Sequence, residues 1–543
     1  MSRPSMAYNA AAGLGGMLKD GHEHYFDDSA NGAVVARNIS AATELSRMLS
    51  SSLGPQGRCK LVVNHLERIV VTSDCASILK EVSVEHPAAK LLELAVQQQE
   101  LECGDGTNLC LMFAGELLTN TVELMKIMGW KHSTDILEGY YLASQHLQAF
   151  LPTIVCETIP HPAKDPSQLS KALKPVLGSK QYGTEEFLSS LVAEACSIVL
   201  KDGEILSPES IRTCKILGGS VSHSACVSGF VAQRGVETVI TSATNAKIAI
   251  FATGIEASST EAKGTVLMKT AEDLRNYNRT EEAKMEEIIQ GIAESGVKVC
   301  VTGGHVSDMA LHFLDKYELL AVKISSKWDL RRLCQATGAT ALVRLGAPTP
   351  DEMGEATVTQ KVVGGKTVTV FEQGESKLAT LVIRASTSSV LADVERAVED
   401  GVHAVQTACK DGRLVYGGGA AEMACSVELD AFADQHPGLE QYAIRAFAKA
   451  LECVSRTLAD NAGWDSLQVV ADQRAAHVKG NTDMGVDILN PRGICSMKEA
   501  QVYDLLATKQ SAFRLGVEAA MTVLKVDQII MSKPAGGPKM PGQ

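Results

Sequence analysis

Apolar positions at helical spacing dominate the first 150 residues of the chain and predict a mainly helical segment. One face of the first expected helix carries five apolar residues: Ile39, Ala42, Leu45, Met48 and Leu49. This helix is expected to end at Leu53-Gly54-Pro55, because glycine and proline interrupt helices. A second helical run begins at Thr107 and ends at Gly129. Between the two runs, LVVN and RIVVTSD predict two short strands of a β-hairpin.

The pattern changes in the centre of the chain, where residues 219–374 are rich in β-branched runs and glycines. Four segments follow one another there: VKVCVTGG, VSDMALHFLDKYE, LLAVKI and WDLRRLCQATG. Their order predicts a β-α-β-α alternation, which is typical of an α/β domain. The polar stretch at about 254–285 is expected to be a mobile surface excursion.

After residue 385 the helical spacing returns. The chain then closes with DQIIMSKP, which predicts a short strand, and with a glycine- and proline-rich tail that is expected to be disordered. The order helical, α/β, helical predicts one helical domain interrupted by a large insertion.

Composition restricts the class of protein. The 543 residues exceed what one core holds, so several domains are expected. A net charge of -13 argues against binding to nucleic acid or to an anionic membrane surface. No apolar run of eighteen residues or more suggests a membrane span, and the N-terminus does not resemble a secretory signal. Fourteen cysteines without a C-x-x-C pair favour reduced thiols in a cytoplasmic protein.

The segment CGDGTNLC, residues 103–110, is the first candidate for chemistry. Its glycines allow the backbone to approach a phosphate, and Thr107 opens a helix whose N-terminus attracts anions. A single acid there, Asp105, is suited to binding a magnesium ion between phosphate oxygens. The alternative is an ordinary Asp or Thr helix cap.

Two further segments allow the same two kinds of interpretation, an anion-binding one and a structural one. SLGPQG, residues 52–57, leaves backbone N–H groups able to face an anion, or simply ends a helix. VYGGGAAE offers bare backbone at Gly417, Gly418 and Gly419 to a ribose or phosphate, or serves as a hinge.

Asp400 lies in DVERAVEDGV, on a helix whose core-facing stripe is expected to be Val390, Val394, Val398 and Val402. A solvated, ion-paired face with Asp393 and Arg396 explains it, although Gly401 could admit a close neighbour to the carboxylate.

The helix after VTGGH carries a second pattern. Its core-facing stripe is expected to be Val306, Met309, Ala310, Phe313, Leu314 and Tyr317. The opposite face offers a mixed polar surface for selective contacts with a bound protein: Asp308, Leu311, His312 and Asp315.

In this order, LGPQG, SDCAS, GDGT, ERAVEDG, GGG and GVD resemble the group II chaperonins, which include the subunits of the eukaryotic cytosolic chaperonin TRiC/CCT. The resemblance extends over nearly the whole chain and implies a multidomain α and α/β fold. It implies a helical equatorial ATP-binding domain at 1–150 and 408–543, and a hinge-like intermediate domain at 151–218 and 375–407. An apical substrate-binding domain would occupy 219–374, with the segment at 254–285 as a built-in lid.

The resemblance also assigns roles to single residues. Contacts to nucleotide phosphates fall to Leu53, Gly54, Pro55, Gly57, Gly106, Thr107 and Asn108. Asp105 would bind Mg2+, and Asp74 and Asp400 would position and activate the attacking water. Since Asp400 lies on the hinge domain, hydrolysis would wait for closure. The nucleoside end falls to Gly418, Gly485 and Glu499.

The implied function is ATP-driven folding inside a cytoplasmic hetero-oligomer of two eight-membered rings. Its implied partners are paralogous subunits, clients such as actin and tubulin, and prefoldin, but neither nucleic acid nor a membrane. The hairpin at 61–72 and the strand at 527–534 would join neighbouring subunits.

Several residues depart from the pattern of the family: Ser73, Cys75, Ser77, Asn108, Ala385, Tyr416 and Gln501. All the carboxylates are retained, so nucleotide binding is expected. The departures support an alternative, a ring subunit that binds nucleotide, hydrolyses it negligibly and acts mainly structurally. A soluble metabolic enzyme that uses ATP is a third class, but the sequence offers no acceptor site for it.

Overall fold

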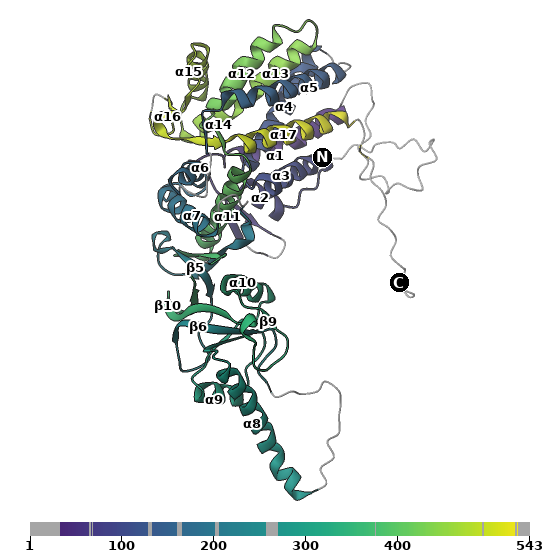
Figure 1. The fold of residues 1–543 in the computed structure, drawn as a ribbon. Helices are drawn as coiled ribbons and strands as arrows, with labels where there is room; N and C mark the ends of the chain where they lie inside the picture. Colours follow the sequence, from purple (N-terminus) through teal and green to yellow (C-terminus); the bar gives the residue numbers. More distant parts are fainter. Residues whose placement is uncertain are drawn as a thin grey trace, which may run out of the picture. The chain divides into compact units, whose positions relative to one another are not determined.

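The computed structural model divides into two compact units (Figure 1). The first unit joins Met1–Thr158 to Arg413–Gln543, and the second is Ile159–Gly412. The structure describes residues 33–526 and 529, apart from 65, 66, 68, 129–132, 160–165, 201–205, 257–269, 375, 491 and 492. The finer division into three domains stays a prediction.

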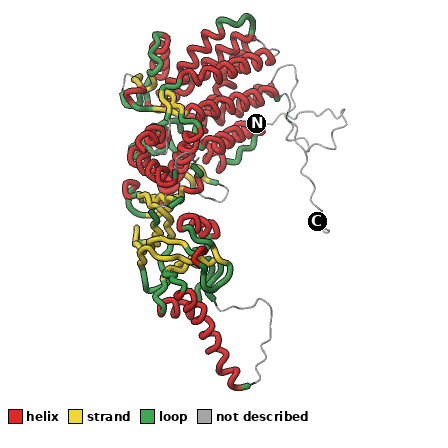
Figure 2. The backbone as a smooth tube through the Cα atoms, in the orientation of Figure 1, coloured by secondary structure: helices red, strands yellow, loops and turns green. Residues whose placement is uncertain are grey.

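The first unit is mainly helical (Figure 2). Its helices are α1 Ala33–Ser50, α2 Cys75–Glu81, α3 Pro87–Cys103, α4 Thr107–Met128, α5 Ser133–Phe150, α12 Ala420–Ala433, α13 Glu440–Leu451, α14 Cys453–Ala462, α15 Ser466–Val478, α16 Met497–Ala500 and α17 Leu506–Lys525, with a 3-10 turn at Leu151–Ile154. Helices from both ends of the chain share one core, since α4 packs on α1 and α3 as well as on α13 and α17.

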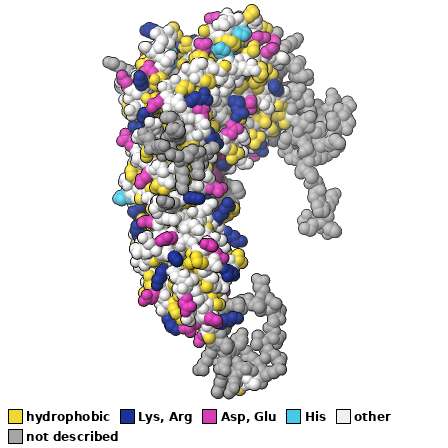
Figure 3. Space-filling model, in the orientation of Figure 1, with side chains coloured by type: hydrophobic (Ala, Val, Ile, Leu, Met, Phe, Trp, Pro, Cys, Tyr) yellow, Lys and Arg dark blue, Asp and Glu magenta, His cyan; other side chains and the backbone are white. Residues whose placement is uncertain are grey.

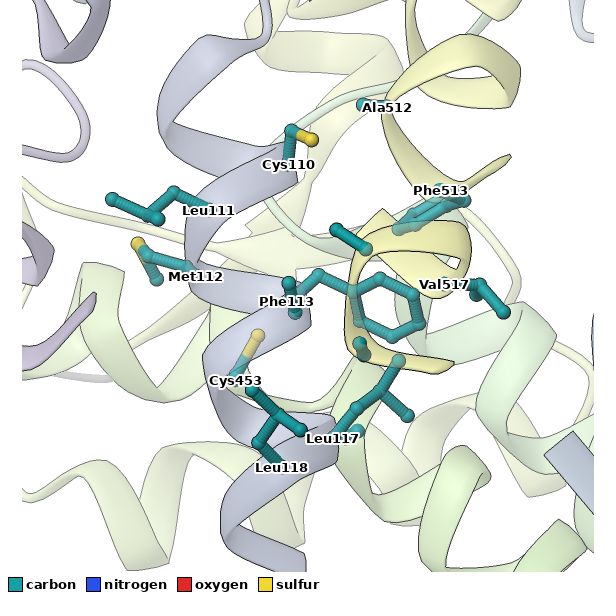
Figure 4. Close-up of a cluster of buried hydrophobic side chains, with 14 of the residues drawn as sticks. Cys110, Leu111, Met112, Phe113, Leu117, Leu118, Cys453, Ala512, Phe513 and Val517 are labelled. Carbon is teal, nitrogen blue, oxygen red and sulfur yellow. The ribbon is translucent and has the colours of Figure 1, made fainter. Parts of the chain in front are cut away.

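The centre of this core is α4, which is apolar nearly all round and is buried on most of its surface. Phe113 on α4 meets Phe513 of α17 edge to face, with ring centroids 5.1 Å apart (Figure 4). It meets Phe447 of α13 in the same way at 5.3 Å. Such contacts add about 0.5–1.5 kcal/mol to the apolar burial of each aromatic pair, so the two segments of the chain form one unit around α4.

Short strands complete the first unit. Strands β1 Lys60–Val63 and β2 Ile69–Thr72 form the antiparallel hairpin that the sequence predicts. Strand β13 Arg413–Tyr416 lies between β3 Glu157–Thr158 and β16 Tyr503–Leu505, and β14 Met484–Val486 pairs with β15 Ile494–Ser496. The predicted strand at 527–534 lies outside the described residues apart from Ile529, as does the C-terminal tail.

The second unit is built on a mixed sheet of nine strands. Its strands are β4 Ile211–Leu217, β5 Ala225–Ala232, β6 Ser242–Phe251, β7 Val299–Thr302, β8 Leu320–Lys323, β9 Ala341–Leu342, β10 Gly354–Val363, β11 Lys366–Glu372 and β12 Ala379–Ala385. The order is β4-β12-β5-β11-β10-β6-β7-β8, with β9 beside β6. Its helices are α6 Pro166–Gly178, α7 Glu185–Val199, α8 Ala271–Glu294, α9 Asp308–Lys316, α10 Lys327–Thr337 and α11 Ser388–Lys410, with 3-10 turns at Pro208–Ser210, Val221–His223 and Pro350–Glu352.

Alternating side chains of β6 explain how helices cover both faces of this sheet. Ile248 and Ile250 join a core with α10, whereas Ala249 and Phe251 join a core with α8 and α9. A third core lies between α6, α7, α11 and the strands β4 and β12. The predicted β-α-β-α alternation is confirmed by β7, α9, β8 and α10, and the multidomain α and α/β class is confirmed as well.

Three predictions about local structure are wrong. Met48 is 47% exposed and does not belong to the buried face of α1. Val390 is 41% exposed, and Leu391 takes its place on the buried face of α11. The segment at 254–285 does not lie wholly outside the core, because α8 begins at Ala271 and its Met285 is buried in a core.

Acidic and basic side chains are interspersed over the face of the molecule drawn in Figure 3. Within the described residues, no helix is long and apolar enough to cross a membrane. All fourteen cysteines are free thiols.

Candidate functional site

Two glycines shape the turn that leads into α4. Gly104 ends α3 in the left-handed region at φ +70°, and Gly106 follows at φ +78°. The carbonyl of Gly106 accepts the first hydrogen bond of α4, from the N–H of Cys110 at 3.0 Å. The N–H groups of Thr107 and Asn108 therefore stand in the first turn, where a helix has no internal acceptors and attracts anions.

Asn108 connects this turn to two other segments. Its Oδ1 accepts from the N–H of Cys75 at the start of α2 (3.1 Å), and its Nδ2 donates to Oγ of Ser52 just after α1 (3.1 Å). The threonine that the family pattern has at this position carries a single hydroxyl, whereas the asparagine amide accepts through one atom and donates through another. Asn108 thus supplies a polar link between three segments.

Asp74 is 8% exposed and caps α2, because its Oδ2 accepts from the N–H of Ser77 at 2.9 Å. Its Oδ1 accepts from Oγ1 of Thr107 at 3.4 Å. The predicted catalytic carboxylate therefore lies beside the first residue of α4. It is a helix cap and a neighbour of the glycine turn at once.

The predicted loop at residues 53–57 closes over the same region. Gly54 has φ +81°, and a Cβ there would lie 2.5 Å from Cδ2 of Leu458, so only glycine fits without a shift. Nδ2 of Asn461 donates to the carbonyl of Leu53 at 2.9 Å, and Gln56 donates to the carbonyl of Ile488 at 3.2 Å. The loop, which also holds Pro55 and Gly57, is thereby attached to the C-terminal part of the chain.

We call residues 52–57, Asp74 and residues 104–108 the first cluster. The second cluster consists of the glycine loop Gly417, Gly418 and Gly419 together with β14. Gly418 and Gly419 have φ +61° and +79°, and the N–H of Val486 donates to the carbonyl of Gly418 at 2.8 Å. A Cβ on Gly418 or on Gly485 would lie 2.6 Å from Met497. Glu499 lies on α16, exposed, two residues after Met497.

The donors present fit a nucleotide phosphate chain with one magnesium ion. Orphan N–H groups of α4 and left-handed glycines offer bare backbone to an anion, and Asp74 and Asp105 offer carboxylate oxygens. Within the described ranges, no group of three or more His, Cys, Asp or Glu side chains could hold a metal alone. A magnesium ion here would thus take most of its ligands from phosphate and water, as it does in nucleotide sites.

Asp400 lies in the second unit, on α11. Its carboxylate accepts from Nζ of Lys180, and the two side chains are 13% and 12% exposed. Next to it, Nε2 of Gln181 donates to Asp393 at 2.6 Å. The predicted solvated face is therefore wrong for Asp400, which the α6–α7 loop largely covers.

Gly401 also departs from its prediction. A Cβ on this glycine would point to leucines of α6 and to Val192 of α7, at 3.4 Å or more. Gly401 thus allows α11 to pack closely on α6 and α7, and its close neighbours are apolar side chains of the core.

The predicted client-binding face of α9 is only partly exposed. Asp308 and His312 are exposed, but Leu311 is half-buried against the core that α8 and α9 share. Asp315 accepts from the N–H of Val239 at 2.9 Å and so anchors a loop. The expectation that all four residues form one free surface is wrong, because two of them contact the unit itself. The core-facing stripe of α9 is confirmed, with Val306, Ala310 and Leu314 buried.

The sequence analysis missed three buried polar residues beside the two clusters: Gln99, Gln473 and Lys509. Each lies in a helix whose pattern would suit an exposed polar residue. The only feature of the sequence that pointed to a buried polar residue was the run of three glutamines before the glycine turn, and this run does not show which glutamine is buried.

A model of the TCP-1/cpn60 chaperonin family matches residues 45–534. The chain therefore belongs to this family of chaperonins, as its motifs predict.

Relatives of nearly equal length are similar throughout. T-complex protein 1 subunit theta of Macaca fascicularis and that of Homo sapiens are each 43% identical over 535 residues, which cover 98% of this chain and 96% of the relative. The subunit theta of Arabidopsis thaliana is 42% identical over 535 residues, covering 97% of this chain and 96% of its own. Segments such as EHPAAKLL and SKWDLRRLC already resemble this theta subunit of TRiC/CCT, and the relatives confirm that resemblance.

Proposed function

We propose that this chain is an ATP-hydrolysing subunit of a hetero-oligomeric, double-ring chaperonin that encloses and folds other proteins. One observation carries the proposal: Asp74 and Ser52 are hydrogen-bonded to the first two residues of α4, and Asp105 precedes that helix by two positions. That arrangement would bind phosphate by backbone N–H groups and keep carboxylates beside it.

Residues of the first cluster would hold the phosphate chain. The N–H groups at Thr107 and Asn108 would donate to phosphate oxygens, and the loop of Gly54 would cover them. Asp105 would hold Mg2+, which neutralises phosphate charge when bound. Gly418 and Gly485 would leave room for the nucleoside, while the exposed Glu499 is the least supported member of the site.

Hydrolysis needs a carboxylate that orients the attacking water. The contact between Asp74 and Thr107, at the start of α4, supports this role for Asp74. Asp400 is the second proposed catalytic carboxylate, and its role comes from the family pattern. In its own unit Lys180 holds the carboxylate in one orientation.

The proposed assembly consists of two eight-membered rings of paralogous subunits in the cytoplasm, with clients such as actin and tubulin and with prefoldin as a delivery partner. The β1–β2 hairpin supports contacts between subunits. Leu61, Val63 and Ile69 are 65%, 58% and 59% exposed on it, and the hairpin has only two strands in the described structure. A partner strand would cover such an edge.

A second function is favoured by one specific observation. Both proposed catalytic carboxylates already accept protein donors, Asp74 from Ser77 and Asp400 from Lys180. A subunit in which these contacts persist would bind nucleotide, hydrolyse it negligibly and act mainly structurally.

A measurement on this chain within the assembled ring separates the two functions. An azido-ATP carrying an α-phosphate label is crosslinked to the subunits, and the nucleotide on this chain is identified as ATP or ADP after one turnover. We expect ADP on the wild-type chain and a rate at least about 100-fold lower in Asp400→Asn, with unchanged crosslinking. Asp393→Asn, on the same helix, is the control and should turn over normally. Persistent ATP on the wild-type chain would favour the structural subunit, and no crosslinking would reject both.

A further inference from the structure

Two glutamines of the first unit are fully buried and make the same kind of contact. Gln99 lies on α3 and Gln473 on α15, and each is 0% exposed. In each case the side-chain nitrogen donates to two backbone carbonyls, and Oε1 has no hydrogen-bond partner among the described residues. A buried amide with an unsatisfied oxygen is costly, so the two donated hydrogen bonds must be what these glutamines supply.

Gln99 serves the first cluster. Its Nε2 donates to the carbonyl of Asp105 at 2.8 Å and to the carbonyl of Thr508 on α17 at 3.2 Å. A Cβ on Gly106 would lie 3.2 Å from the same nitrogen and 2.9 Å from Cγ2 of Thr508. Gln99 therefore fixes the backbone of the proposed metal ligand against α17.

Gln473 serves the second cluster. Its Nε2 donates to the carbonyl of Gly419 at 3.2 Å and to the carbonyl of Met484 at 3.1 Å. Those two residues border the glycine loop and Gly485. Gln473 therefore holds together the two backbone segments proposed to receive the nucleoside.

The orientation of both amides follows from their partners. If nitrogen and oxygen were exchanged, the side-chain oxygen would face two carbonyl oxygens, and no hydrogen bond would remain. Neither glutamine reaches the nucleotide surface through a free donor, because its described N–H partners are backbone carbonyls. Each one can act on a ligand only through the loop that it holds.

We propose that Gln99 and Gln473 are positioning residues for the two ends of the nucleotide site, Gln99 for the magnesium-bearing turn and Gln473 for the nucleoside loops. The inference rests on the proposed nucleotide binding of this chain and adds a division of labour within it. Partners that orient a metal ligand change metal affinity by about 10–100-fold. Removal of Gln99 should therefore affect magnesium dependence, whereas removal of Gln473 should affect nucleotide affinity itself.

Each glutamine is the matched control for the other. Gln99→Met and Gln473→Met keep an unbranched side chain of similar volume and remove both donors. The full chain is studied in its assembled particle by crosslinking with azido-ATP. Two quantities are measured. The first is the magnesium concentration that gives half-maximal crosslinking, and the second is the azido-ATP concentration that gives half-maximal crosslinking when EDTA removes magnesium.

We expect Gln99→Met to raise the half-saturating magnesium concentration about 10-fold or more, with the EDTA curve within about twofold of wild type. We expect Gln473→Met to shift the nucleotide curve about 10-fold with and without magnesium, a change in binding free energy of about 1.4 kcal/mol. The inference would be overturned if both variants raised the half-saturating magnesium concentration and the half-saturating nucleotide concentration by the same factor. A general destabilisation of the unit would produce that result.

Two further outcomes are decisive. If a methionine variant does not enter the particle, Gln99→Leu and Gln473→Leu, which also remove both donors without placing a charge inside the unit, are read by the same criteria. The inference alone would be overturned if the wild-type chain crosslinks but the Gln99 and Gln473 variants do not differ in which of the two half-saturating concentrations they change. A wild-type chain that does not crosslink would reject the proposed function and, with it, the inference.

Discussion

The buried lysine beside the glycine loop allows a quantitative test. Lys509 on α17 is 4% exposed, and its Nζ donates to Glu422, which is 1% exposed, and to Oδ2 of Asp504 at 2.9 Å. Burial alone would lower the pKa of Lys509, but Asp504 and Glu422 outweigh burial and raise its pKa above the usual range. Asp504 precedes α17 and Glu422 follows Gly419, so Lys509 ties together the elements on both sides of the glycine loop.

The perturbation is Lys509→Met. A pair of charges 2.9 Å apart attracts by about 6 kcal/mol at an effective dielectric constant near 20, but desolvation cancels several kcal/mol of this. The attraction to Asp504 is discounted further because that side chain is 34% exposed. Glu422 decides the result, since one of its oxygens already has no hydrogen-bond partner among the described residues. Removal of one partner of such a pair costs about 3–5 kcal/mol.

The double variant Lys509→Met with Glu422→Gln supplies the control. It leaves no unpaired carboxylate at the fully buried position, since the remaining one, Asp504, is 34% exposed. We therefore expect it to be more stable than the single variant by about 2 kcal/mol or more. The raised pKa means that this contribution is complete below the unfolded pKa of lysine, about 10.4, and is lost only as pH rises through the folded pKa. Measurements at pH 7 therefore report the full effect.

Tryptophan fluorescence during urea unfolding measures the first unit selectively. Trp464 belongs to that unit and reports on it, and Trp328 of the second unit is 70% exposed and replaceable by phenylalanine. The urea concentration at the unfolding midpoint of the first unit should be lower in Lys509→Met than in the wild type. In the double variant it should lie between these two values. A double variant as unstable as the single one would refute the reasoning from an unpaired buried carboxylate.

Three more predictions follow from the same unit. Gly106→Ala should weaken ATP crosslinking at least about 10-fold, because its Cβ would meet Thr508 at 2.9 Å; Gly183→Ala, equally left-handed but with nothing within 4 Å, should leave crosslinking unchanged. Gln501→Gly should stabilise the unit by about 1 kcal/mol, since residue 501 has φ +55°; a lower urea midpoint would contradict this. Burial lowers the pKa of His477, so its contribution is complete above the unfolded pKa of about 6.5 and is lost as pH falls. The unfolding temperature of His477→Gln should therefore decrease less between pH 7 and pH 5 than that of the wild type. An equal decrease in both proteins would show that His477 does not cause it.

Much of the local structure could be predicted because its causes lie close together along the chain. Thr107 opens a helix after a glycine, and α4 begins at that residue. The alternation from Val299 to Thr337 follows from side-chain periodicity and appears as two strands and two helices. The segment at 254–285 misled the prediction because the sequence of α8 is highly polar, although its Met285, Ile289 and Ile292 pack in a core.

The candidate site was predicted as a set of residues, and the structure supplied their contacts. Asn108 illustrates the difference. The sequence shows an amide where the family has a second threonine, but the bonds to Cys75 and Ser52 span 33 and 56 positions. Leu311 and Asp315 illustrate the reverse case, since helical spacing placed them on a free face and tertiary contacts occupy them.

The sequence by itself determined the family, the order of helical and α/β segments, and the glycines and carboxylates proposed to bind nucleotide. These features depend on residue type, spacing and local backbone conformation. Only the tertiary structure decided which polar side chains are buried and what they hold. Gln99 reaches Thr508 over 409 positions, and Lys180 reaches Asp400 over 220. Such contacts form when distant segments pack around a common core, and no local pattern distinguishes their members from polar residues that face water.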